Sequence, residues 1–260
     1  MMLPQTEPSG LTPKGLILGY SGLLAMVAGF VNAVALLVLA FPVGNLTGVT
    51  TQLGMDTANP WLYEGHVLSA ILLGFLAGTA AAGAILARTD AHTGPRHAAV
   101  LIIEAVFLLL AALGVEETAV KAEIAAAGIE RAVVQALFAA AALGLQNGLT
   151  SNTPGMAIRT THFTGTVTDL GLMIGRSRRH GIDRWKAAVL TVTLLLFLTG
   201  GVAGILTGAW LAGYALLLPA AVCVAVAIIG LVHGRGRPAS PSGTNPQPSQ
   251  NMATDDRRFR

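Results

Sequence analysis

The chain has 260 residues, of which 53% are hydrophobic and only 11% are charged, and its formal net charge is +3 at pH 7. A soluble domain carries about 25% charged residues, so this composition, with a mean hydropathy of +0.65, indicates an integral membrane protein. The single cysteine, Cys223, excludes a disulfide framework within one chain. The basic residues lie mainly between apolar segments, which points to membrane topology and not to a nucleic-acid partner.

The first fourteen residues are polar and rich in proline, and they lack the features of a signal peptide. Six apolar segments of about 18 to 27 residues follow, each long enough to cross a hydrocarbon core of about 30 Å. We predict spans at 15–40, 67–87, 98–115, 129–149, 187–213 and 214–232. The last two are nearly contiguous, which predicts a tight hairpin at 211–214. The tail, residues 234–260, is rich in Arg, Pro, Ser, Gln and Asn and is predicted to be disordered.

The sequence also repeats itself. The nine residues of Leu46–Gly54 return as Phe163–Gly171 with five identities. Two shorter motifs return at a similar offset, namely Gly29–Ala33 as Gly144–Gly148 and Phe75–Gly78 as Phe197–Gly200. Self-similarity of this kind indicates that the fold is built from two copies of one unit.

Each copy holds three predicted spans, and an odd number of spans reverses the second copy across a bilayer. The predicted fold class is therefore all-α integral membrane, with six transmembrane helices as two inverted three-helix repeats, a plan common among transporters. Broken or re-entrant helical segments are expected after spans one and four. The first repeat covers residues 15–115, an extracytoplasmic connector covers 116–128, and the second repeat covers 129–233.

The distribution of Lys and Arg predicts the orientation. The first loop has neither residue, whereas basic residues gather in the second and fourth loops and after the last span: Arg88, Arg96, Arg176, Arg178, Arg179, Arg184, Lys186, Arg235 and Arg237. We predict a multi-pass protein of the bacterial cytoplasmic (inner) membrane, with its N-terminal segment, residues 1–14, and its C-terminal tail in the cytoplasm.

The segments 44–56 and 151–175 are too polar for ordinary spans and too apolar for plain loops. Each contains turn residues and then a stretch that could restart as a helix near Asn45 or Thr161, whose side chains suit an N-cap. A broken helix at membrane depth is tolerated only where it is buried or lines a water-filled cavity. The free N–H groups at such a helix start favour anions.

We hypothesise that the two Thr-Gly helix starts face each other across a central solute site. Asn45 and Gln52 of the first copy become His162 and Asp169 in the second, and Arg159 is added nearby, which favours a small anionic or polar solute. The candidate binding residues are Asn45, Thr47, Thr51, Gln52, Arg159, His162, Thr164, Thr168 and Asp169. The alternative is that the threonines cap helices, the glycines permit packing, and Arg159 lies at the cytoplasmic interface.

Glu104 lies in the third predicted span, roughly 12 Å beyond Arg96 at helical rise. An ionisable group at that depth is expensive and is a functional candidate. It is interpreted either as a proton-coupling carboxylate or as a neutral acid bonded to a neighbouring helix. Asn32 and Asn147 lie beside stripes of small residues, where a helix-to-helix hydrogen bond is favoured over solute contact.

At these motifs the chain resembles the YoaK-like family of bacterial multi-pass inner-membrane proteins, which carry a domain of unknown function. The likeness rests on Gly44–Gly48 and on the run from Asn147 to Gly171, and it covers about residues 15 to 233. The resemblance implies a six-span protein of the cytoplasmic membrane and supplies no catalytic residues.

The sequence favours a small-solute secondary transporter or channel, with the lipid bilayer and a small-molecule solute as partners; a homo-oligomer is left open. The alternative is a non-transporting membrane scaffold, assembly or sensory protein in which the repeat is architectural. No catalytic motif and no metal-ligand spacing of histidines on one helix are found, so no enzyme activity, cofactor or metal is expected. A transporter predicts a polar cavity that holds Thr47, Thr164 and Asp169, whereas a scaffold predicts a dry, fully packed bundle.

Overall fold

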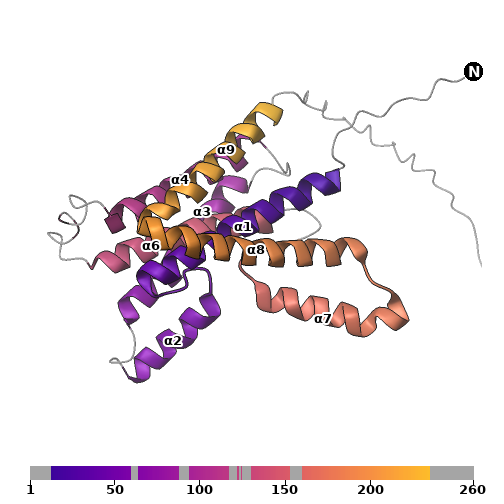
Figure 1. Ribbon diagram of the computed structural model, residues 1–260, viewed down its shortest axis with the longest axis horizontal. Coiled ribbons are helices and arrows are strands. Elements are labelled where there is room, and N and C mark those ends of the chain that lie inside the picture. Colours follow the sequence, from indigo (N-terminus) through magenta and orange to yellow (C-terminus); the bar gives the residue numbers. More distant parts are fainter. Residues whose placement is uncertain are drawn as a thin grey trace, which may run out of the picture.

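The computed structural model describes residues 13–59, 64–87, 94–116, 122, 124, 130–152 and 160–234, and the regular elements within them are helices (Figure 1). The predictions made for most of the N-terminal segment, most of the connector, the tail after residue 234, and Arg159 fall outside the described residues. They stay predictions.

The long helices coincide with the predicted apolar segments to within a few residues. They are α1 (Pro13–Leu39), α3 (Gly65–Leu86), α4 (Pro95–Glu116), α6 (Arg131–Ser151), α8 (Arg184–Leu211) and α9 (Leu217–Gly234). Among the described residues, five stretches are long and apolar enough to cross a membrane, and the last of them, Arg184–Val232, contains both α8 and α9.

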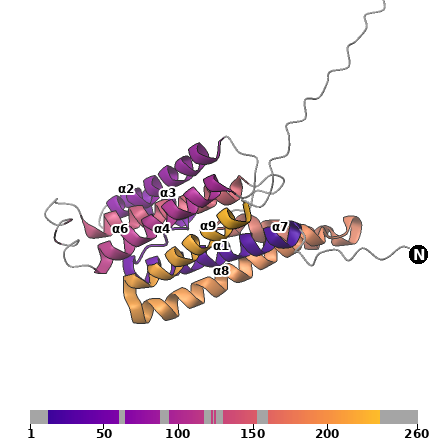
Figure 2. The ribbon, with the colours of Figure 1, turned by 90° about the horizontal axis from the view of Figure 1, so that it is seen from above.

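The chain reverses direction between α8 and α9, in the region where the sequence predicts a hairpin (Figure 2). A short 3-10 helix, η1 (Ala212–Leu216), connects the two. Ala212 has a φ of 49°, a left-handed conformation that ends the α-helix before it. After the turn, α9 packs along α4.

Two shorter helices follow α1 and α6, where the sequence predicts interrupted segments. They are α2 (Leu46–Ala58) and α7 (Phe163–His180). Helix α2 packs on α3, and α7 packs on α8. Both lie at the edge of the bundle, toward opposite ends of it (Figures 1 and 2). The segment that leads into each of them reaches into the bundle, as described below.

Glycines bring the backbones of two helix pairs, α1–α8 and α3–α6, into direct contact. Four of them face a carbonyl group of the partner helix: Gly29 faces Phe197, Gly200 faces Met26, Gly144 faces Phe75 and Gly78 faces Ala141. A Cβ atom at any of these positions would lie well under 3.0 Å from the carbonyl oxygen. Such close approach gives van der Waals contact, which drives helix association in a membrane where the hydrophobic effect is absent.

These two interfaces use matching motifs of the sequence repeat. Gly29 and Gly144 occupy the same place in their motif, and so do their partners Phe197 and Phe75. The first helix of each copy therefore packs against the second long helix of the other copy. In both interfaces the contacts advance in the same direction along both chains, so the paired helices run parallel.

Large apolar side chains cover the outside of the long helices. Leu198 and Val202 of α8 are 55% and 61% exposed, and Leu73 and Leu76 of α3 are exposed to a similar degree. A soluble monomer rarely shows such contiguous apolar patches. The long apolar helices and this surface together indicate a membrane protein.

Candidate functional site

A hydrogen bond inside the bundle connects the segment before α2 to α1. The backbone N–H of Gly44 donates to Oδ1 of Asn32 at 2.8 Å. Asn32 lies about two turns before the end of α1, or roughly 10 Å at helical rise. The chain that leaves α1 therefore folds back along it before α2 begins.

The segment before α7 has the matching link. The hydroxyl of Thr161 donates to Oδ1 of Asn147 at 3.3 Å, and Nδ2 of Asn147 donates to the carbonyl of Leu143 in its own helix. The prediction that Thr161 caps α7 is therefore wrong by one residue, because its hydroxyl is engaged by Asn147 and the N-cap is His162. The sequence also predicted that Asn32 and Asn147 bond to a neighbouring helix. Among the described residues, Asn32 instead bonds to the segment before α2, and Asn147 to its own helix and to the segment before α7.

The segments that precede α2 and α7 touch each other. A Cβ atom on Gly44 would lie 3.3 Å from Cγ2 of Thr161 and 3.1 Å from Cδ1 of Leu143. Leu143 lies near the middle of α6, and Gly44 and Thr160 are both buried. The segments that lead into α2 and α7 thus meet inside the bundle, whereas the N-cap residues Asn45 and His162 are exposed.

The glycine of each Thr-Gly pair makes room for the N-cap side chain. Oδ1 of Asn45 accepts from the backbone N–H of Gly48 at 3.1 Å, and a Cβ on Gly48 would lie 2.9 Å from Nδ2 of Asn45. In the second copy, a Cβ on Gly165 would lie 2.7 Å from Nδ1 of His162, which makes no side-chain cap hydrogen bond. The backbone N–H groups at the start of α7 therefore have no side-chain cap as a hydrogen-bond acceptor.

The threonines divide into two kinds. The hydroxyls of Thr51 and Thr168 donate to the carbonyls of Thr47 and Thr164, at 2.9 and 2.8 Å, one turn earlier in each helix. These two hydroxyl protons are thus used within the helix. Thr47 and Thr164 are exposed, and their hydroxyls remain available to a solute.

Gln52 and Asp169, which occupy equivalent positions in the repeat, have different surroundings. Asp169 pairs with Lys186 of α8 at 2.9 Å, and both side chains are 43% exposed. Gln52 is half-buried, and its Oε1 has no hydrogen-bond partner among the described residues. The ion pair gives Asp169 a structural role that the sequence did not indicate.

Glu104 is fully buried in α4, and among the described residues neither carboxyl oxygen has a hydrogen-bond partner. The thiol of Cys223 in α9 lies beside the carboxyl, and the buried hydroxyl of Tyr20 in α1 is close enough to interact with it electrostatically. Charge at such a place is costly unless it is paired. Sequence reasoning missed Tyr20 and Cys223 because they come from helices far apart in the chain.

Glu104 and the two helix starts form separate places in the molecule. Within the described residues, α4 contacts α6, α9, η1, α3 and no part of α2 or α7. Glu104 is therefore not in contact with the helices that carry the Thr-Gly motifs.

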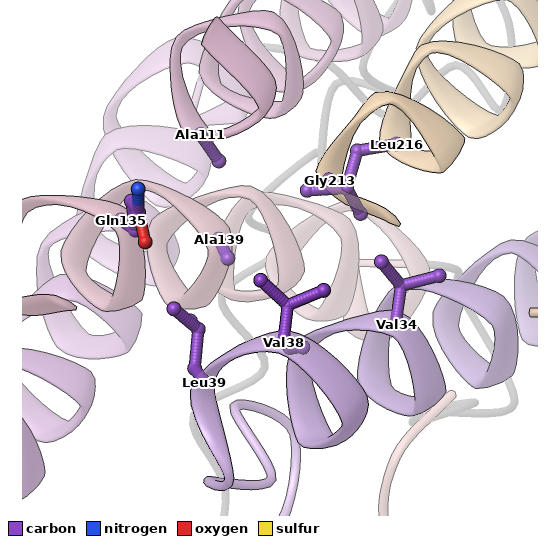
Figure 3. Close-up of a pocket in the computed structure, with 9 residues that line it drawn as sticks. Val34, Val38, Leu39, Ala111, Gln135, Ala139, Gly213 and Leu216 are labelled. Atoms are coloured by element: carbon purple, nitrogen blue, oxygen red, sulfur yellow. The ribbon is translucent and has the colours of Figure 1, made fainter. Parts of the chain in front are cut away.

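A small cavity lies elsewhere, between α1, α4, α6 and η1 (Figure 3). Val34, Val38 and Leu39 line it from α1, and Gln135 is its polar residue. Its volume is about 10 Å³, about the space of one water molecule. Nε2 of Gln135 has no partner within the described part of the chain, but the other lining residues are apolar and do not supply the two to four polar partners of a buried water. The cavity is too small for a solute.

Within its described residues the protein is thus all-helical, with long helices apolar enough to cross a membrane and two short helices whose preceding segments meet inside the bundle. A family model described as "Protein of unknown function (DUF1275)" matches residues 21–229, and the chain belongs to this family. The resemblance to an uncharacterised family is confirmed, whereas its narrower name stays a prediction. The sequence matches neither a curated protein nor a solved structure.

Proposed function

We propose that this protein is a small-solute transporter or channel of the bacterial cytoplasmic membrane, with its solute site at the starts of α2 and α7. The contact between Gly44 and Thr161 carries the proposal, because it joins the two segments that lead directly into α2 and α7 and so brings the starts of these helices near each other. Backbone N–H groups and the helix dipoles make such starts suitable for a small anion or a polar solute. Asn45, Thr47, His162 and Thr164 would provide the side-chain contacts.

We further propose that the chain crosses the membrane six times as two inverted repeats. The matched glycine contacts of α1–α8 and α3–α6 support this plan, because one pseudo-two-fold operation relates them. Both pairs are parallel, as required when spans one and five run one way and spans two and four run the other.

Two tryptophans support a complete crossing by α8. Trp185 lies near its start and Trp210, 89% exposed, near its end. They are separated by about 38 Å at helical rise, which places both in the interfacial regions where tryptophan is enriched. Helix α9 would then form the sixth crossing after the reversal at η1.

A non-transporting scaffold is the second candidate, and specific contacts favour it. Asp169 is paired with Lys186, and the hydroxyls of Thr51 and Thr168 bond within their own helices. In a scaffold the exposed side chains of Thr47 and Thr164 would be covered by another protein and would not contact water.

The accessibility of single cysteines tests these candidates. In a Cys223→Ser background, Thr47→Cys and Thr164→Cys would each be treated in membranes with a small water-soluble thiol reagent, applied from either side. A water-filled path predicts labelling at both positions, with Thr47→Cys labelled from the extracytoplasmic side and Thr164→Cys from the cytoplasmic side.

Leu198→Cys is the matched control, because Leu198 of α8 is 55% exposed but would face lipid and not water. It should stay unlabelled. If all three cysteines are protected in folded protein, the path does not exist and the scaffold is supported. If Thr47→Cys and Thr164→Cys are labelled, the protein would be reconstituted into proteoliposomes and tested for uptake of small anions and polar solutes.

A further inference from the structure

We propose that Glu64, His66 and Glu130 form a binding site for a divalent transition-metal ion, with zinc as the best match. The ligand atoms of these three side chains all lie within 4.8 Å of one another. Nε2 of His66 is in direct contact with Oε2 of Glu130. The site is distinct from the proposed solute site and does not depend on transport.

Two helix starts hold the three side chains together. Glu64 is the N-cap of α3, His66 lies in its first turn, and Glu130 is the N-cap of α6. About two turns further along, Gly74 meets the carbonyl of Leu137, closer than a Cβ would permit. Because this backbone contact fixes α3 against α6, the ends that carry the ligands are held side by side.

The donor set matches a borderline metal. One imidazole nitrogen and two carboxylate oxygens are ligands that zinc accepts, and three protein ligands leave a fourth tetrahedral position for water. All three residues are exposed, so the ion can enter from solvent. A bound cation would also neutralise the two carboxylates that meet here.

The competing explanation is that His66 and Glu130 form only an ion pair. The role of Glu64 distinguishes this explanation from a metal site. His66 and Glu130 pair without Glu64, and an exposed ion pair of this kind adds little to stability. A metal requires all three residues. The sequence search for ligands on one helix missed the cluster because Glu130 is far from the other two in the chain.

Zinc binding to the purified full chain tests the proposal. Tag-free protein in detergent would be stripped with a chelator and titrated with zinc chloride by calorimetry, beside Glu64→Gln and His66→Gln. We expect one zinc ion per wild-type chain. In each variant the dissociation constant should rise by at least about 10- to 100-fold, because losing a ligand costs no less than losing a residue that orients one. Added zinc should raise the melting temperature of the wild type only.

His162→Gln is the matched control, because it removes another exposed imidazole at a helix start and should bind zinc like the wild type. Melting temperatures without metal show that each variant is folded. The proposal is overturned if the wild type binds no zinc at this site, or if Glu64→Gln binds it as tightly as the wild type, which would leave only the ion pair.

Discussion

Asn32 and Asn147 hold equivalent segments through hydrogen bonds that differ in length and in the type of donor. Asn32 accepts from a backbone N–H of buried Gly44 at 2.8 Å, whereas Asn147 accepts from the Thr161 hydroxyl at 3.3 Å, and a hydroxyl can rotate to another partner. We predict that Asn32→Ala lowers the free energy of unfolding by about 1–3 kcal/mol, since it strands a buried donor. Asn147→Ala should cost about 0.5–1.5 kcal/mol. Unfolding in mixed micelles would measure both, and a larger loss for Asn147→Ala would contradict the assignment.

Glu104 is kept in the core, where the thiol of Cys223, a weak donor, lies beside its carboxyl and no stronger hydrogen bond is made among the described residues. This is a cost to stability. Replacing it with an apolar residue of similar volume is therefore predicted to be neutral or stabilising, by about 1–3 kcal/mol. Glu104→Leu should melt at the wild-type temperature or several degrees higher while any proton-coupled activity is lost.

Cys223→Ala serves as the control for Glu104→Leu, because it alters the neighbour of the carboxyl and leaves the carboxyl in place. If Glu104→Leu melts markedly lower than the wild type, the carboxyl makes a stabilising bond, and its role is structural.

At the level of single residues, the sequence predicted those features that depend on neighbouring residues in the chain, such as a helix cap or the burial of a side chain within an apolar segment. Asn45 is the N-cap it was expected to be, and Glu104 is buried as its apolar neighbours indicated. The cap of α7 was misplaced because the hydroxyl of Thr161 is engaged by Asn147, a contact that local pattern does not contain. Lys186, the partner of Asp169, was missed for the same reason.

At the level of elements, adjacent glycines of α8 offer a direct test of the packing. A Cβ on Gly200 would collide with the Met26 carbonyl, whereas the nearest atom to a Cβ on Gly201 is 3.9 Å away. We predict that Gly200→Ala lowers the free energy of unfolding by about 1–3 kcal/mol through overpacking. Gly201→Ala should be neutral or gain up to about 1 kcal/mol from helix propensity.

Thermal melts of both variants in the same detergent would check this prediction. Equal behaviour of the two alanines would mean that α1 and α8 are not in backbone contact in the native protein. The comparison is internally controlled, because the residues are neighbours and the chemical change is the same.

The helices themselves were predictable because hydropathy is a local property. Runs of about twenty apolar residues allow little besides a spanning helix. The choice of partners was not predictable, because stripes of small residues indicate close packing without saying which helix approaches. The residues that follow α1 and α6 were recognised as interrupted segments from their polarity, but their mutual contact at Gly44 and Thr161 required the structure.

At the scale of the whole molecule, the two sequence repeats are interlocked. Helix α1 of the first repeat packs on α8 of the second, and α3 of the first packs on α6 of the second. Neither repeat can bury its glycine faces alone. We predict that fragments 1–122 and 123–260 are each degraded when expressed separately, whereas the two accumulate as a complex when co-expressed in one cell.

Fragment levels on membrane immunoblots, with co-purification through a tag on one fragment, would measure this. A control pair that carries Gly78→Leu, which blocks the α3–α6 contact, should no longer co-purify. Stable accumulation of either fragment alone would show that a repeat is an independent domain.

The parallel pairing of α1 with α8 also sets a delay during synthesis. About 170 residues separate Gly29 from Phe197, and a ribosome that adds 5–20 residues per second needs about 9 to 34 s to make them. Throughout this interval the glycine face of α1 is in the bilayer without its final partner. The nascent chain therefore depends on lipid or an insertion factor to shield that face, and the native pairing of α1 forms only after α8 has been made.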